Sequence, residues 1–359
     1  MTRQRSICFF GIYDPAYARN RVLMRGFREN GYDIVECRVD PHQVRGVMKY
    51  VYLFQRYREV RHLPFNLILV AFPGHTVVWF ARLLFGRRII FDAFVSLYDS
   101  NVCDRKTHSP KSVAALLDRF WDWSSVSLAQ TVLLDTEQHI DYFVRTYSVS
   151  REKIVRVWVG TDDAVFYPRP AVKSSFVAHF HGRFIPLHGI RYIIEAAHIL
   201  RNEPIEFRLV GKGQEYEKIR DEIRKHRLTN VSLIDAVPYE RLPEFIASAS
   251  ACLGIFGDTD KTTRVIPNKV YEYLAMGEAI ITADTPAIRG LSIYGELPMV
   301  LVPPADAAAL AQAIRKLRDE PEQRRSLGVA AHAFYEAHFT PVRIVADLLA
   351  HLPDNVVCS

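Results

Sequence analysis

The stretch FVAHFHGRFIPLHGIRYIIEAAHIL, residues 176–200, joins a short apolar run, a turn with glycines and an amphipathic helical pattern. The apolar run ends at Gly182 and is followed by Arg183. A helix is expected to begin near Gly189. Strand, turn and helix in this order form the repeating unit of a parallel sheet, because parallel strands need a crossover connection. A guanidinium beside a helix N-terminus suits a phosphate group, although an ordinary surface arginine fits Arg183 as well.

Short apolar runs of this kind recur along the chain. Six precede the break at Pro168 to Pro170 and six follow it; many are rich in β-branched residues and end at Gly, Pro or Asp. These features are typical of buried parallel strands. The sequence therefore predicts an α/β protein with two Rossmann-like doubly wound domains that face a central cleft. The expected parts are residues 1–168, residues 171–336, and a C-terminal helix and tail over 337–359 that packs back on the N-terminal domain.

Composition and cysteine usage indicate a globular protein of a reducing compartment. Of the 359 residues, 49% are hydrophobic and 24% are charged, which is ordinary for a globular chain. The five cysteines lie far apart, without a C-x-x-C pair or a Cys/His cluster, so neither a disulfide framework nor a zinc site is predicted. No signal peptide is recognisable, and Pro-Gly-His interrupts the apolar segment 65–85, so we expect a cytoplasmic protein without a membrane span.

The excess positive charge lies at the N-terminal end. Residues 1–62 hold 12 Lys and Arg against 6 Asp and Glu, a surplus equal to the net charge of +6 of the whole chain. This asymmetry favours an anionic partner. A nucleic acid is not the predicted partner, because no recognised nucleic-acid module accompanies the charge.

Residues 44–61 form an amphipathic helical pattern within this basic region. One face carries the apolar residues Val44, Val47, Met48, Val51 and Phe54, and the basic residues Arg45, Lys49 and Arg56 lie elsewhere. Two interpretations fit the pattern. The apolar face packs on the domain core, or the helix lies peripherally on an anionic surface at the inner face of the membrane.

Two stretches of the second half have the character of ligand sites. In LVGKG, Gly211 and Gly213 stand between a strand and a helix, where they admit a ligand or simply form a tight turn. In PNKVYEYLAMG, a helix closes at Gly277 as a C-cap and carries Glu272 in an otherwise apolar pattern. Because a buried carboxylate without a partner is costly, Glu272 either stays solvated or meets a ligand.

Taken together, GRFIPLHG, LVGKG and PNKVYEYLAMGEAIITAD resemble the donor-binding half of GT-B glycosyltransferases, in particular the retaining glycosyltransferase family 4. The resemblance covers most of residues 176–320. It implies a hexosyltransferase-type enzyme of polysaccharide biosynthesis that moves a sugar, with retention, from a nucleoside diphosphate sugar to a hydroxyl of a small-molecule, lipid-linked or cell-surface glycan acceptor. It implies no metal or other cofactor. The alternatives are a nucleotide-sugar epimerase or hydrolase of the same fold, and a non-catalytic sugar-nucleotide-binding scaffold.

The resemblance also implies roles for single residues. Arg183 would bind the donor diphosphate and stabilise its departing charge, and Glu272 would hold the ribose hydroxyls. The backbone around Ala236 and Val237 would meet the base. Asn268, at the start of the Glu272 helix, is a further donor-binding candidate, as are the two glycines of LVGKG.

Two positions depart from the family pattern. His188 stands where the family usually has a second lysine for the diphosphate, and we take it as the candidate for that role. Arg264 stands where the family tends to have a glutamate on the donor sugar. It is expected to contact an anionic group of the donor or to pair with Asp258 or Asp260. The Asp-x-Asp of this loop resembles metal sites of another glycosyltransferase fold but is more typical of a solvated turn.

The first half provides candidates with less family support. Gly11 and Arg19 belong to the first strand-to-helix segment, where the family has a mobile loop near the sugar phosphates. His75 follows another strand end, where it is either structural or a group that transfers protons. The segment FDAFVSLYDSNVCDR resembles a recurring segment of some family 4 proteins and supplies the acceptor-side candidates Asp92, Ser96, Tyr98 and Asp99.

Overall fold

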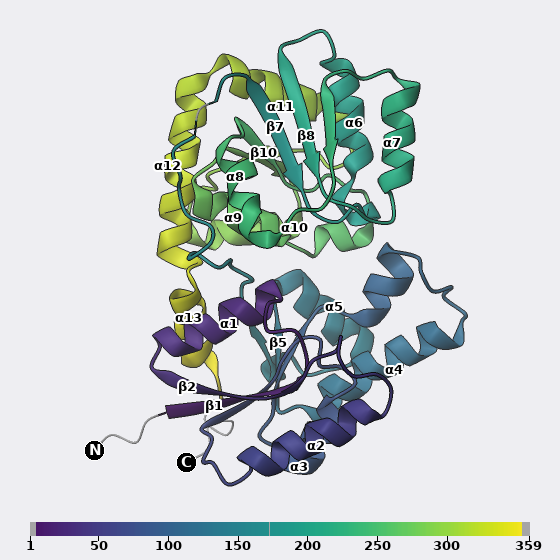
Figure 1. The fold of residues 1–359 in the computed structure, drawn as a ribbon, viewed down its shortest axis with the longest axis vertical. Helices are drawn as coiled ribbons and strands as arrows, with labels where there is room; N and C mark the ends of the chain where they lie inside the picture. The colour runs from purple at the N-terminus through teal and green to yellow at the C-terminus, as the bar shows by residue number, and fades with distance from the viewer. Residues whose placement is uncertain (1–4, 172, 354–359) are drawn as a thin grey trace. The chain divides into compact units, whose positions relative to one another are not determined.

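The structure is a computed structural model that describes residues 5–171 and 173–353. It divides into two compact units. The N-terminal unit takes the chain up to Val102, Lys106–Gly160 and the chain from Thr340 onward, and the C-terminal unit takes Cys103–Arg105 and Thr161–Phe339. Each unit has its own sheet and its own flanking helices (Figure 1).

The N-terminal unit contains a six-stranded parallel sheet in the order β2-β1-β3-β4-β5-β6. A helix follows each of its first five strands, and α13 is added from the C-terminal end of the chain. The strands are β1 (Arg5–Ile12), β2 (Tyr32–Val39), β3 (Leu67–Val70), β4 (Ile90–Phe94), β5 (Thr131–Leu134) and β6 (Ile154–Arg156). The helices are α1 (Ala18–Glu29), α2 (Met48–Val60), α3 (Val78–Phe85), α4 (Val113–Leu128), α5 (Glu137–Tyr147) and α13 (Pro341–His351).

The C-terminal unit contains a second six-stranded parallel sheet, in the order β12-β11-β10-β7-β8-β9. Here a helix follows every strand, and α12 follows α11 directly. The strands are β7 (Phe176–His181), β8 (Ile205–Val210), β9 (Val231–Ile234), β10 (Ala251–Leu253), β11 (Ile280–Ala283) and β12 (Val300–Val302). The helices are α6 (Ile190–Ile199), α7 (Tyr216–Lys225), α8 (Leu242–Ala247), α9 (Asn268–Met276), α10 (Pro286–Arg289), α11 (Ala307–Asp319) and α12 (Pro321–His338).

These two sheets confirm the predicted class of two Rossmann-like doubly wound domains. Each of the twelve apolar runs of the sequence contains one strand. The runs are continuous rather than alternating, because helices cover both faces of a doubly wound sheet and bury successive side chains on opposite faces.

Helix α13 returns to the N-terminal unit and packs on α1. Gly26 of α1 makes this contact possible, since a Cβ at that position would collide with the carbonyl oxygen of Pro341. Asn30, which caps α1, also donates a hydrogen bond of 2.9 Å from Nδ2 to the carbonyl oxygen of Val342.

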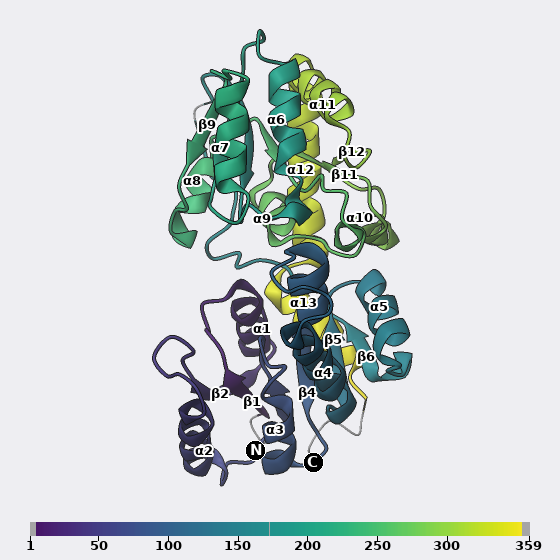
Figure 2. The ribbon, with the colours of Figure 1, turned by 90° about the vertical axis from the view of Figure 1, so that its right-hand side faces the viewer.

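Strand β7 determines what the two faces of the C-terminal sheet carry. Its residues Phe176, Ala178 and Phe180 belong to the apolar core with α6 and α11. The intervening histidines, His179 and His181, lie on the opposite face, where the ring of His181 lies 5.2 Å from that of Tyr273 on α9. Figure 2 shows α6 and α7 side by side on the face of the sheet that carries Phe176, Ala178 and Phe180. The alternation of β7 thus brings two histidines to the helix that carries Glu272.

Candidate functional site

The candidate site of the C-terminal unit lies at the carboxyl end of β7 and the N-terminus of α9. Gly182 and Arg183 follow β7 directly, and Gly182 adopts a φ of +136°, which side chains other than hydrogen rarely allow. Helix α9 begins at Asn268 after Pro267 and ends at Gly277, whose φ of +69° is that of the expected C-cap. The carboxyl edge of a parallel sheet and the partial positive charge of a helix N-terminus therefore meet here.

Glu272 is buried in α9 and has a protein partner. Its side chain is only 6% exposed, and Oε2 lies 2.6 Å from Nε2 of His181. No other described residue forms a hydrogen bond with the Glu272 side chain, so its Oε1 atom is not engaged by these residues. The Nδ1 atom of His181 in turn lies 3.2 Å from the hydroxyl of Tyr273 and 3.2 Å from Nε2 of His179. The carboxylate is held in one orientation by a buried chain of polar groups, which makes it neither solvated nor uncompensated.

Lys269 is the principal group that sequence reasoning missed. It is the second residue of α9 and is 4% exposed, and its Nζ atom has no hydrogen-bond partner among the described residues. The ammonium group lies 4.1 Å from the ring centroid of Phe180. Burial lowers the pKa of Lys269 to about 7, against the opposing effect of Glu272. The only signal in the sequence was a lysine three positions before the glutamate, on a helix whose other residues are mostly apolar.

His188 does not provide the cation that the family pattern requires. Its Nδ1 atom lies 2.5 Å from the carbonyl oxygen of Arg183, so the proton sits on Nδ1 and Nε2 has none. Burial, followed by the repulsion of Lys269, holds the pKa of His188 well below its usual range. The ring is therefore neutral at pH 7.

Arg183 is exposed, as a phosphate-binding arginine has to be. No described residue forms a hydrogen bond or ion pair with its side chain. Its backbone is fixed from one side by the hydrogen bond of His188 to the Arg183 carbonyl oxygen. The side chain is therefore available to a ligand.

The glycines of LVGKG hold the adjacent turns together. A Cβ on Gly211 would collide with the carbonyl oxygen of Gly182, and a Cβ on Gly213 would lie 2.6 Å from the backbone nitrogen of Phe184. Both positions require glycine because two backbone turns approach each other closely. Packing alone accounts for both residues, as the turn interpretation expected.

Arg264 pairs with one of the two aspartates considered for it. It is 7% exposed, and Nη1 forms an ion pair with Asp260, a residue whose side chain is 82% exposed. Asp258 has different partners: Nη2 of Arg191 at 2.6 Å and the hydroxyl of Tyr192 at 3.0 Å. The Asp-x-Asp of this loop is thus occupied by arginines and a tyrosine.

Three further donor candidates are placed without a distinguishing contact. Ala236 is exposed and Val237 is half-buried, in the segment between β9 and α8. Asn268 is half-buried as the first residue of α9.

In the N-terminal unit, Arg19 has a structural role that differs from the expected one. It lies in the first turn of α1, not in the loop before it, and is fully buried. Its Nε and Nη2 atoms donate to the carboxylate of Asp92 on β4, at 3.0 to 3.2 Å. Its Nη1 atom donates to the carbonyl oxygens of Val157 and Trp158. All these partners are internal, so neither Arg19 nor Asp92 is free to bind a ligand.

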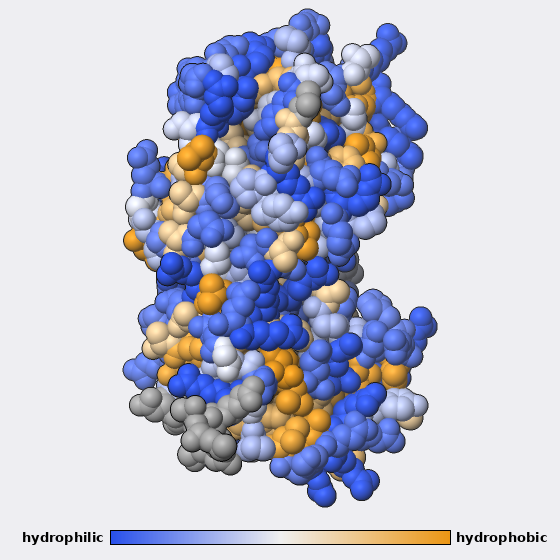
Figure 3. Space-filling view, turned by 60° about the vertical axis from the view of Figure 1, so that its left-hand side comes forward, coloured by the Kyte–Doolittle hydropathy of each residue, from blue (hydrophilic) through white to orange (hydrophobic). Residues whose placement is uncertain are grey.

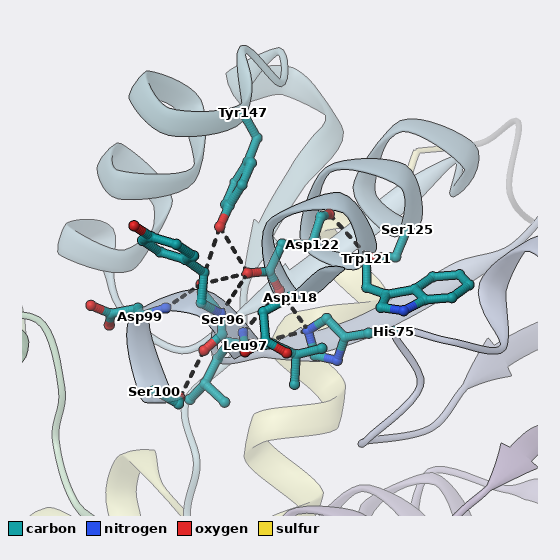
Figure 4. A network of polar contacts seen from close by, with 12 residues as sticks. His75, Ser96, Leu97, Asp99, Ser100, Asp118, Trp121, Asp122, Ser125 and Tyr147 are labelled. Carbon is teal, nitrogen blue, oxygen red and sulfur yellow. Dashed lines mark hydrogen bonds and ion pairs between the residues drawn. The ribbon is translucent and has the colours of Figure 1, made fainter. Parts of the chain in front are cut away.

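Asp122 of α4 organises a second buried network at the carboxyl end of β4 (Figure 4). It accepts hydrogen bonds from the hydroxyls of Ser96 and Tyr147 at 2.7 and 2.8 Å, and from the backbone nitrogens of Leu97 and Tyr98. His75 lies beside it, with Nε2 3.0 Å from the carbonyl oxygen of Val95 and 3.5 Å from Asp122 Oδ1. This network fixes the loop after β4.

The remaining candidates of the first half are placed as follows. His75 is 2% exposed, and burial lowers its pKa, so the structural interpretation holds for it. Ser96 and Asp99 are buried and Tyr98 is half-buried. Gly11 belongs to β1 itself and has a φ of +146°.

Most of the apolar residues that the sequence analysis assigned to the α2 face are exposed. Leu53 is its only fully buried residue, whereas Val47, Met48, Val51 and Phe54 are between 44% and 78% exposed. Exposed apolar residues continue on α3 and α4: Trp79, Leu83, Val113, Leu116, Leu117, Phe120 and Trp123. On the face drawn in Figure 3, hydrophobic side chains also gather on the N-terminal unit. Packing on the domain core is therefore the wrong interpretation for most of the α2 face.

Comparison with known families identifies the C-terminal unit. The family described as Glycosyl transferases group 1 matches residues 175–320. Residues 175–320 are therefore similar to a glycosyl transferases group 1 domain. This domain contains the whole candidate site, from β7 to α9. A curated relative in Escherichia coli (strain K12), named as the colanic acid biosynthesis glycosyl transferase WcaI, is 28% identical over 140 residues. That match covers 38% of this chain and 34% of the relative, so the chain matches about a third of the relative's length.

Solved structures of the GT-B fold match nearly the whole chain. Sucrose-phosphate synthase from Thermosynechococcus elongatus has a TM-score of 0.75 at 17% identity and covers 96% of this chain and 98% of its own. Anabaena HepE, solved in complex with UDP-glucose, has a TM-score of 0.71 at 16% identity and covers 97% of this chain and 100% of its own. The group 1 domain is thus one half of a GT-B fold. Among the residues that the structure describes, no helix has the length and hydropathy to cross a bilayer.

Proposed function

We propose that the chain is a glycosyltransferase that moves a sugar from a nucleoside diphosphate sugar to a hydroxyl acceptor. The observation that carries the proposal is the arrangement at α9: a buried carboxylate, Glu272, is fixed by His181 through one oxygen and presents the other to a ligand. A ribose, whose adjacent hydroxyls donate hydrogen bonds, matches a carboxylate that has one unused oxygen to accept them. The family match and the UDP-glucose complex of HepE support the same ligand class.

Arg183 and the α9 N-terminus supply positive charge where a diphosphate departs. As the glycosidic bond to the diphosphate breaks, negative charge grows on the leaving phosphate oxygen. An exposed guanidinium and the unpaired N–H groups of a helix N-terminus stabilise such a charge without moving a proton. This chemistry requires no metal, and transfer with retention of configuration belongs to the same proposal.

The α2 face supports a second part of the proposal, namely contact with an anionic membrane surface. Val47, Met48, Val51 and Phe54 are exposed, and Lys49 and Arg56 lie on the same helix. Apolar side chains enter the headgroup boundary and basic ones attract anionic lipids. A lipid-linked acceptor, made and held at such a surface, fits this arrangement.

The test of the proposed activity is transfer of a labelled sugar. Purified protein is incubated with UDP-, GDP-, ADP- and dTDP-sugars and a panel of soluble and lipid-linked acceptors, and the anomeric configuration of the product is read by NMR. We expect a glycosylated acceptor with the configuration of the donor. Isomerised or released sugar in the absence of an acceptor would instead show an epimerase or hydrolase, and binding without any turnover would show a scaffold.

A further inference from the structure

Lys269 combines two properties that together are energetically costly. It is nine-tenths buried, and its Nζ atom has no hydrogen-bond partner among the described residues. An ammonium group in this state loses its hydration without a full replacement, and the ring of Phe180 compensates only part of that loss. A ligand that accepts hydrogen bonds from the ammonium group would compensate the rest of that loss.

The ammonium group lies at the turn that follows β7. A Cβ built on Gly182 would be 3.2 Å from Lys269 Nζ and 3.4 Å from Cε1 of His188, so both side chains border the same small space. The ammonium group of Lys269 therefore lies near the same point as the His188 ring, although Lys269 belongs to a different element, the N-terminus of α9. No hydrogen bond has to break when the ammonium turns toward phosphate oxygens at Gly182.

The charges around this space are unbalanced. Glu272 is the one carboxylate that interacts electrostatically with Lys269, and its Oε2 is already bound to His181. The other titratable groups that face the space are bases: His179 and His181 on β7, and His188 on the following turn. Arg183 adds an exposed guanidinium. His179 and His188 are uncharged at pH 7, so Lys269 and Arg183 are the groups here that supply positive charge to a dianion.

We propose that Lys269 is the cation that binds the diphosphate of the donor, in place of the lysine that the family has at the position of His188. This assignment rests on the proposed function. It explains why a neutral His188 is tolerated: the charge is supplied from α9 while His188 holds the Arg183 backbone. Arg183 and Lys269 then approach the diphosphate from the turn and from the helix.

The assignment has a pH signature. Burial lowers the pKa of Lys269 to about 7, so this side chain is cationic below pH 7 and increasingly neutral above it. A bound diphosphate favours the charged form, so affinity is highest below pH 7 and declines as the pH rises toward 9. The pKa of both His179 and His188 is lowered well below the usual range, so neither titrates in this interval. A nucleotide sugar is a diester of diphosphate, so its own charge stays constant there.

The experiment compares the wild type with Lys269→Met, a neutral side chain of similar length. Binding of a nucleotide sugar and of the corresponding nucleoside is measured by calorimetry from pH 6 to pH 9, with the exposed Lys225→Met as the control for loss of one positive charge. We expect Lys269→Met to weaken nucleotide-sugar binding about ten- to hundredfold at pH 6 and to abolish the decline above pH 7. Binding of the nucleoside, which has no phosphate, should be unchanged.

Two outcomes distinguish a failure of the proposed function from a failure of the Lys269 assignment. If the wild type binds no nucleotide sugar, the proposed function fails and the assignment fails with it. If the wild type binds and Lys269→Met binds equally well with the same pH dependence, only the assignment is overturned. A double variant, Lys269→Met with His188→Lys, should regain most of the affinity; if it stays as weak as the single variant, the two positions do not reach the same phosphates.

Discussion

The two units have the same architecture, but the principal charged groups near their strand ends differ in how they are paired. In the N-terminal unit, Arg19 and Asp92 are both fully buried and neutralise each other, and the carboxylate of Asp122 has four close hydrogen-bond donors. In the C-terminal unit, the Nζ atom of Lys269 has no hydrogen-bond partner in the part of the chain that the structure describes, and Arg183 is exposed. Satisfied groups stabilise a fold, whereas groups left partly unsatisfied at the same edge of a sheet indicate a ligand.

The largest expected effect comes from breaking the buried ion pair of Arg19 and Asp92. Arg19→Met leaves Asp92 as a buried, unpaired carboxylate and should lower the free energy of unfolding by about 3–5 kcal/mol. Chemical denaturation measures it. The matched control is Arg56→Met, which breaks the exposed pair with Glu59 and should cost less than about 1 kcal/mol. Equal costs for the two variants would show that burial does not make the Arg19 pair structural.

The second effect concerns the open carboxylate. If Glu272 binds the ribose, the wild type should bind a ribonucleotide sugar about tenfold more tightly than its 2′-deoxy analogue, because the analogue leaves a hydrogen bond to a charged group unmade. Glu272→Gln should lose most of this preference, and calorimetry with both ligands measures it. A variant that keeps the full preference would remove Glu272 from the ribose site. His181→Gln is the companion variant, expected to weaken the preference by releasing the carboxylate.

A further effect is expected at the surface of α2 that we propose to contact a membrane. Replacing Lys49 and Arg56 by Gln should weaken binding to vesicles of anionic phospholipid by about 1 kcal/mol per charge, and high salt should do the same to the wild type. Vesicle flotation measures binding. The control replaces Lys218 and Lys225 of α7, on the other unit, by Gln. Salt-independent flotation, or no flotation of the wild type, would contradict the proposed surface.

A further effect is on the stability of the protein as a function of pH. Because the pKa of Lys269 is lowered by burial, the folded protein binds this proton less well than the unfolded chain does. The wild type should therefore gain stability relative to Lys269→Met as the pH rises from about 7 to 10. Denaturation of both proteins at pH 7 and pH 9.5 measures the difference. A constant difference would mean that burial does not perturb the lysine.

Local patterns were enough to predict the fold. Each strand is a continuous apolar run because helices cover both faces of each sheet, and Gly277 ends α9 because a left-handed C-cap favours glycine. The order of GRFIPLHG, LVGKG and the Glu272 helix was enough to locate the candidate site within residues 175–320.

The pairing and protonation of side chains whose partners lie far away in the chain could not be predicted from the sequence. Arg19 was expected near a ligand because the sequence does not show its pairing with Asp92, which is 73 residues away. The neutral state of His188 and the isolation of Lys269 both depend on burial among segments that a single sequence does not connect. An amphipathic pattern likewise predicted an apolar face on α2 without showing whether that face is covered.

The central claim is that the open site of the C-terminal unit binds a nucleoside diphosphate sugar. Thermal unfolding of the wild type is the most direct measurement, with UDP-, GDP-, ADP- and dTDP-sugars at increasing concentration. A ligand that binds only the folded protein raises the melting temperature by mass action. The account predicts a saturable rise for at least one nucleotide sugar, and the rise should be smaller in Lys269→Met. No rise for any of them would contradict it.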